Sequence, residues 1–214
     1  MSLRVHQLAL GPIETNAYVA FAQGRDDAVV IDPSADAAAI RAALDRDGRT
    51  CAAILITHGH WDHVCAVADL AEITDAPVHM PAGERDLLES LDDYLPPGVE
   101  ARAWTPDVLL EGTETLQVAG VEFEVLSVPG HSPAHVAYAT GGQVFSGDVL
   151  FAGSVGRTDL PGADWETLVA SLRRLFDRLV PETVVHPGHG PATTLAAELA
   201  TNPFLDQLRA ERGG

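Results

Sequence analysis

The feature that most constrains the fold is a run of metal-binding side chains directly after a short apolar segment. Residues 57–63 read Thr-His-Gly-His-Trp-Asp-His, and the apolar residues 52–56 before them predict a buried strand. Three histidines and an aspartate this close together cannot all be buried without partners, and imidazole and carboxylate groups suit zinc and other first-row metals. Because a loop at a strand end can turn several side chains into one cavity, we expect His58, His60, Asp62 and His63 to bind metal.

Three later segments repeat the combination of a strand end, a glycine and a possible ligand. They contain His131 in Val-Pro-Gly-His, Asp148 in Phe-Ser-Gly-Asp and His189 in His-Pro-Gly-His-Gly. A neighbouring glycine lets the backbone approach closely. Each segment alone is a weak signal, but four such sites in one chain of 214 residues are far more specific. Together they predict a metal-dependent enzyme.

The rest of the chain mixes strands and helices in two similar successions. Turn residues predict hairpins that join 115–118 to 121–128 and 134–139 to 143–146. Apolar spacing predicts an amphipathic helix over 165–179, and Ser34 is a plausible N-cap for a helix over 34–47. We expect two packed sheets with helices outside them.

Composition limits the partners. The formal net charge is −18 and every cationic residue is arginine, so the surface repels nucleic acid and anionic membranes. Two cysteines, Cys51 and Cys65, make no disulfide framework. Residues 1–10 show no signal peptide, and no uncharged apolar run approaches the roughly 18 residues of a spanning helix. We expect a single cytoplasmic domain over 1–214; the sequence does not indicate its oligomeric state.

The ordered set of five histidines and two aspartates resembles that of the metallo-β-lactamase-fold superfamily, over nearly the whole chain. The resemblance implies an α/β fold, a four-layer αβ/βα sandwich with metals at one edge. It implies that His58, His60 and His131 hold one ion, while Asp62, His63 and His189 hold a second. Asp148 would bridge the two ions.

A pair of ions suggests a hydrolytic mechanism. Two divalent ions, most simply zinc, can share a water and lower its pKa to around 7, which supplies hydroxide for attack on a carbonyl. Asp62 would be both a ligand and the catalytic group that orients the hydroxide. Iron and manganese accept the same ligands, so the metal stays open.

Three further stretches resemble the glyoxalase II-like branch, whose members hydrolyse thioesters such as S-lactoylglutathione. They are residues 11–18, 153–162 and 188–191, the last followed by Asn-Pro-Phe at 202–204. The match is to short bacterial members without a separate C-terminal glutathione-binding domain. Because only residues 190–214 follow His189 and none is lysine, glutathione and other small thiols stay open as the carrier.

Two other functions remain possible from sequence. Arg157-Thr158-Asp159 also resembles a motif of persulfide dioxygenases, which use one iron, and a non-catalytic metal-binding protein on the same scaffold is a third possibility. Arg157 either pairs with Asp159 or binds a substrate carboxylate. We expect His135 to be a strand residue rather than a neighbour of the metal, and Tyr94 and Trp104 to line a substrate entrance.

Overall fold

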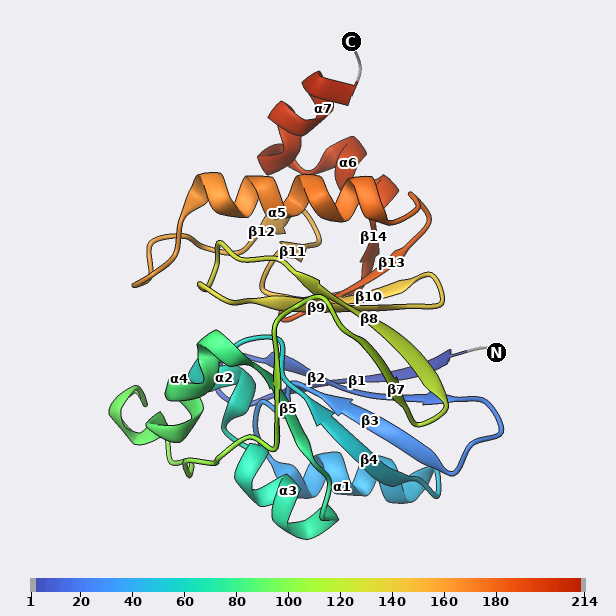
Figure 1. Cartoon of the computed structure of the whole chain (residues 1–214), viewed down its shortest axis with the longest axis vertical. Helices are drawn as coiled ribbons and strands as arrows, with labels where there is room; N and C mark the ends of the chain where they lie inside the picture. The colour runs from blue at the N-terminus through green and yellow to red at the C-terminus, as the bar shows by residue number, and fades with distance from the viewer. Residues whose placement is uncertain (1–2, 213–214) are drawn as a thin grey trace.

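Two six-stranded sheets lie face to face in the computed structural model, which describes residues 3–212 (Figure 1). The strand order is β1-β2-β3-β4-β5-β6 in the first sheet and β14-β13-β10-β9-β8-β7 in the second. Residues 1–2 and 213–214 of the predicted domain lie outside the described residues, and its single-domain organisation stays a prediction.

The first half of the chain builds the first sheet and the helices beneath it. Its strands are β1 (Leu3–Leu10), β2 (Thr15–Ala22), β3 (Asp27–Ile31), β4 (Thr50–Leu55), β5 (Val78–Pro81) and β6 (Val108–Leu110). Its helices are α1 (Ala37–Arg46), α2 (Trp61–Val64), α3 (Val67–Thr74) and α4 (Arg85–Glu89), with 3₁₀ turns at Ala82–Glu84 and Leu91–Asp93. Strands β3 to β6 run parallel, so their carboxyl ends share one edge of the sheet.

The second half builds the second sheet and the helices above it. Its strands are β7 (Thr115–Val118), β8 (Val121–Ser127), β9 (Val136–Thr140), β10 (Gln143–Gly147), β13 (Val184–Pro187) and β14 (Thr193–Thr194). A small separate hairpin joins β11 (Leu150–Phe151) to β12 (Ser154–Val155). Its helices are α5 (Trp165–Arg178), α6 (Leu195–Thr201) and α7 (Asp206–Arg212), with a 3₁₀ turn at Pro203–Leu205.

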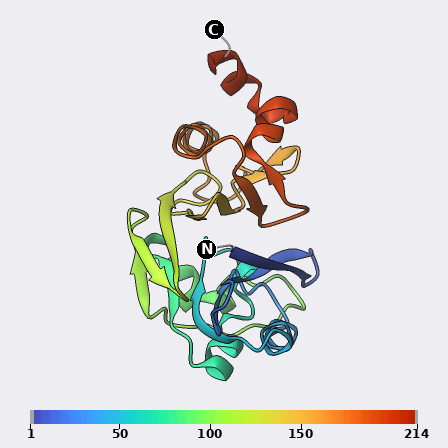
Figure 2. The ribbon, with the colours of Figure 1, turned by 90° about the vertical axis from the view of Figure 1, so that its right-hand side faces the viewer.

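Three buried apolar clusters fill the three spaces between four layers. The first, with Val19, Ile40 and Leu70, lies between the first sheet and α1 and α3. The second lies between the sheets and contains Tyr138, and the third packs Leu172 of α5 onto the second sheet. Figure 2 shows the same halves from the side, with α6 and α7 beyond α5. The predicted four-layer αβ/βα sandwich is therefore confirmed.

The local expectations are mostly confirmed, and one of them is corrected. Both predicted hairpins and the helix over 165–179 form. Helix α1, however, begins after Asp36, whose carboxylate accepts from the Ala39 amide at 3.0 Å, so the prediction of Ser34 as N-cap was wrong. Ser34 instead donates to the Thr15 carbonyl at 3.1 Å.

Two further observations concern the composition. Cys51 and Cys65 are both free and partly buried. Within residues 3–212, no helix is both long and apolar enough to cross a membrane.

Candidate metal centre

The first group of ligands forms where the segment after β4 meets the segment after β8. His58 Nε2 lies 3.1 Å from His60 Nδ1, which lies 2.9 Å from His131 Nε2. His58 is fully buried, because it leaves β4 at the edge where the sheets face each other. Three imidazole nitrogens therefore converge on one point, in the combination expected for the first ion.

The second group forms beside the first. His63 Nε2 lies 3.4 Å and His189 Nε2 lies 3.3 Å from Asp62 Oδ2. Asp148 lies between the groups: its Oδ1 is 3.3 Å from His63 Nε2, and its Oδ2 is 3.5 Å from His131 Nε2. All seven predicted residues are thus brought together, and Asp148 occupies the position expected of a bridging ligand.

Hydrogen bonds behind the histidines decide which nitrogens face the centre. His131 Nδ1 donates to the Arg157 carbonyl at 2.9 Å, and His63 Nδ1 donates to Asp32 Oδ2 at 3.0 Å. Each neutral ring then presents the lone pair of Nε2. His63 Nε2 and Asp148 Oδ1 are buried and lack a hydrogen-bond partner among the described residues. Buried imidazole nitrogens and carboxylate oxygens that face one another without a hydrogen bond are the donor set of a cation site, so the residues fit divalent metal ions.

The electrostatics of the second group point the same way. Burial alone lowers the pKa of His189, but hydrogen bonds to Asp148 and Asp62 raise it to about 9. Burial likewise opposes protonation of His63, yet the Asp148 and Asp62 carboxylates hold its pKa well above the usual value. In the first group, burial and His131 lower the pKa of His60 to about 4. The carboxylates thus attract positive charge to the second group, while the first presents neutral imidazoles.

Asp32 is a supporting residue that our sequence reasoning missed. Besides His63, its carboxylate accepts from the Thr57 amide and from Thr57 Oγ1, both at 2.7 Å. Thr57 Oγ1 in turn lies 3.0 Å from His58 Nδ1. Asp32 directly follows the buried strand β3, so a polar residue at a strand end was the available signal.

His135 was also misjudged. It lies just before β9 and is fully buried, with its ring stacked on His58 at 4.5 Å. Its Nε2 accepts from the backbone amide of Asp148 at 3.1 Å. His135 therefore supports two ligands directly, and the expectation of a plain strand residue was wrong.

The loop that carries His189 is held by the opposite sheet. Asn16 Nδ2 donates to the carbonyls of Pro187 and Gly190, both at 2.9 Å, and Tyr18 Oη donates to the Pro187 carbonyl at 2.6 Å. Thr15 Oγ1 donates to Asp62 Oδ2 at 2.8 Å. The start of β2 thus connects ligands from both halves of the chain.

A cleft of about 690 Å³ opens beside the ligands. Tyr94 and Arg157 are among its lining residues, so Tyr94 lies beside the candidate ligands, as a residue of a substrate entrance would. Trp104 is absent from the described lining and packs against the core beneath the first sheet, so that expectation was wrong. Arg157 is exposed and pairs with Asp159 through two hydrogen bonds, of 2.6 and 2.7 Å. This is the structural alternative that we had considered for it.

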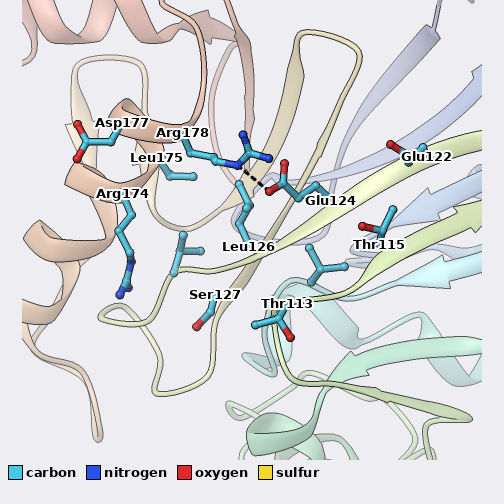
Figure 3. A pocket seen from close by; sticks show the side chains of 13 residues that line it. Thr113, Thr115, Glu122, Glu124, Leu126, Ser127, Arg174, Leu175, Asp177 and Arg178 are labelled. Carbon is cyan, nitrogen blue, oxygen red and sulfur yellow. Dashed lines mark hydrogen bonds and ion pairs between the residues drawn. The ribbon is translucent and has the colours of Figure 1, made fainter.

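A second hollow, of about 740 Å³, lies between β8 and α5 (Figure 3). Arg178 Nε of α5 donates to Glu124 Oε1 of β8 at 2.8 Å across it. None of the seven candidate ligands lines this hollow. Hollow size therefore does not locate the chemistry in this molecule; the convergence of donor atoms does.

Comparisons with known proteins agree with this geometry. The profile of the Metallo-beta-lactamase superfamily matches residues 10–189. The hydroxyacylglutathione hydrolase GloC of Haemophilus influenzae is 35% identical to this chain, over 84% of this chain and 88% of its own length.

Two solved structures are also similar over their whole lengths. The BLEG-1 B3 metallo-beta-lactamase superposes with a TM-score of 0.89 and 40% identity, over 95% of this chain and 100% of that one. TTHA1623, crystallised in a di-iron-bound form, superposes with a TM-score of 0.79 and 45% identity, over 94% and 100%.

Proposed function

The chain belongs to the metallo-β-lactamase superfamily, and from this premise we propose that it is a binuclear metal-dependent hydrolase that cleaves S-acyl thioesters. The observation that carries the proposal is the pair of donor groups joined through Asp148 beside an open cleft. The resemblance seen in the sequence is thereby confirmed at the level of the family. Since this fold serves many reactions, the substrate must be argued from the site.

Each ion would have its own ligands. His58, His60 and His131 would hold the first, Asp62, His63 and His189 the second, and Asp148 would contact both. Bound there, two divalent ions would supply Lewis acidity and lower the pKa of water towards neutrality. The donor set accepts zinc, iron or manganese, and the di-iron form of TTHA1623 supports testing iron beside zinc.

The protein's own groups prepare the attacking water. Thr15 Oγ1 donates to Asp62 Oδ2, which leaves Asp62 Oδ1 to accept a hydrogen bond from the water and orient it. Asp32 fixes the ring of His63, and the Arg157 carbonyl fixes that of His131. Water attacks the thioester carbonyl, the carbon–sulfur bond breaks, and the products are a carboxylic acid and a thiol.

Two observations support a thioester. The similar GloC is named for hydroxyacylglutathione hydrolysis, and the glyoxalase II-like stretches lie at the site. Gly11 begins the turn before β2, residues 153–162 include Arg157 and Leu160 of the cleft, and residues 188–191 hold His189. Each of these three stretches therefore contributes to the candidate centre or its cleft, through Ile13, Arg157 and His189.

The test is thioester hydrolysis by zinc-loaded and iron-loaded protein, with S-D-lactoylglutathione and S-D-lactoyl-N-acetylcysteamine as substrates. Turnover of at least one ester, lost in His58→Ala, is expected. His6→Ala is the matched control, because His6 pairs with Asp47 at 2.9 Å and belongs to none of the ligand groups. Metal analysis should give two ions per chain. Failure to hydrolyse either ester with both ions bound would refute the proposal.

The BLEG-1 likeness favours a second candidate, β-lactam hydrolysis. The same preparations tested on a β-lactam distinguish the two functions by their relative kcat/KM. Oxygen uptake with glutathione persulfide, by iron-loaded protein holding one ion per chain, would instead indicate a dioxygenase.

A further inference from the structure

The walls of the cleft beyond the ligands are apolar and carry little free charge. The described apolar residues that line it are Ile13, Trp61, Leu87, Tyr94, Leu160 and the prolines 133 and 161. Ile13 and Tyr94 are 50% and 54% exposed, so they offer apolar surface to whatever lies in the cleft.

Three charged residues besides the ligands line the cleft: Glu84, Asp86 and Arg157. Glu84 is fully buried, and both of its carboxylate oxygens already accept hydrogen bonds from backbone amides. Its Oε2 accepts from the Gly59 amide at 3.1 Å and its Oε1 accepts from the Ala134 amide at 2.9 Å. Only Asp86 and Arg157 are therefore left to meet a substrate.

The positive charge of Arg157 is itself paired with a carboxylate. Its Nε and one terminal nitrogen donate to the two oxygens of Asp159, at 2.6 and 2.7 Å, in a bidentate pair. Apart from the buried Glu84, the charges of Asp86 (−1), Arg157 (+1) and its partner Asp159 (−1) sum to −1 beside the cleft. Among the described lining residues, no other arginine is present, and the sequence contains no lysine.

The thiol half of a substrate must lie against this wall, because the acyl carbonyl has to reach the ligands. Glutathione brings two carboxylates and one ammonium, and the wall offers its carboxylates no unpaired cation. Unpaired like charges at an interface are costly. We propose that the natural carrier is an uncharged thiol with apolar surface next to its sulfur, an inference that rests on the proposed thioesterase function.

The first test compares two esters of the same acyl group, S-D-lactoyl-N-acetylcysteamine and S-D-lactoylglutathione. We expect kcat/KM to be at least about tenfold higher for the uncharged ester, mainly through KM. Calorimetry with the S-hexyl thioethers of the two thiols measures binding without turnover. The thioether of N-acetylcysteamine should bind more tightly than that of glutathione. Equal or tighter binding of the glutathione derivative would overturn the inference.

A matched pair of variants tests the cause. Asp159→Asn releases Arg157, so the preference for the uncharged ester should fall about threefold, in line with the modest strength of exposed ion pairs. Asp27→Asn is the control, because Arg25 and Asp27 form the same bidentate pair at the same spacing, with both bonds 2.9 Å long. Arg25 follows the end of β2, whereas Thr15, which donates to Asp62, begins that strand. An equal change of preference in both variants would contradict the role assigned to the Arg157 pair.

These outcomes separate the two proposals. If neither ester is hydrolysed by the metal-loaded protein, the thioesterase function itself fails. If both are hydrolysed and the glutathione ester is preferred, the function stands and only the inference about the carrier fails.

Discussion

At the scale of single residues, the centre depends on one position without a side chain. Gly188 lies between His186 and His189, and its amide donates to the Gly147 carbonyl at 2.8 Å. A Cβ at this position would overlap Asp148 Oδ1 and come within 2.7 Å of His63 Cε1. The glycine is required for close approach, so the two ligands can sit against the backbone of the His189 loop.

We therefore predict that Gly188→Ala weakens the binding of the second ion. The added methyl group must displace Asp148 or His63, so metal content should fall towards one ion per chain and activity by about 10- to 100-fold. Atomic absorption and steady-state kinetics measure both. Gly190→Ala is the control: its Cβ meets nothing within 4 Å, although its φ of +76° adds backbone strain. Two ions retained in Gly188→Ala would contradict the steric argument.

The seven candidate ligands could be singled out from the sequence, but the residues that support them could not. Each candidate ligand is a histidine or aspartate close to a glycine, and this local pattern is visible in one sequence without a structure. Asp32 and His135 act through contacts at sequence separations of 25 and 13 residues, to Thr57 and Asp148, and look ordinary in their own segments. Only the folded arrangement shows that their hydrogen bonds end on the ligand set.

At the scale of elements, β13 delivers the His189 loop and is held by a buried histidine. His186 pairs in register with Phe145 of β10, and their rings stack at 4.8 Å. Its Nε2 donates to Gln143 Oε1 at 2.7 Å. Burial lowers the pKa of His186 to about 4, so the folded protein keeps this ring neutral.

This buried histidine predicts acid sensitivity. The unfolded chain binds a proton near pH 6.5 and the folded chain only near pH 4, so stability is complete above 6.5 and is lost as the pH falls between these values. His186 alone would contribute a loss of up to about 3 kcal/mol. Urea unfolding at pH 7 and pH 4.5 measures it, and His186→Phe should reduce the difference. An unchanged difference would exclude His186 as the cause.

Element boundaries were less predictable than elements. The helix expected over 34–47 spans only Ala37–Arg46 as α1, and the residues after His60 form two short helices, with a break between the end of α2 at Val64 and the start of α3 at Val67. Because α2 carries Asp62 and His63, its position is set by the ligand groups rather than by helix propensity. The segment 94–110 contains three prolines and one glycine and is mostly irregular, but Val108–Leu110 still pairs with β5.

At the scale of the whole molecule, the centre lies at the seam between two halves. His58, His60, Asp62 and His63 follow β4 in the first half, whereas His131, Asp148 and His189 follow strands of the second. Each candidate group draws ligands from both halves. Bound ions would therefore cross-link the sheets as well as serve the reaction.

Metal removal should accordingly lower the melting temperature. An ion at 100 times its Kd stabilises by about 2.7 kcal/mol, which for a chain of this length corresponds to roughly 5–10 °C. Differential scanning calorimetry with and without a chelator measures the shift. The double variant His58→Ala, His63→Ala should show little response to the chelator. An unshifted melting temperature, with the ions demonstrably removed, would show that the halves are held together without them.

The division of the ligands between the halves has a consequence for how the protein becomes active. Neither half holds a complete ligand group, so a chain that is unfinished, cleaved or wrongly docked has no centre to load. The ions would bind only after both sheets have folded against each other, so metal loading would distinguish correctly folded chains from the rest. Only correctly folded molecules would then become active.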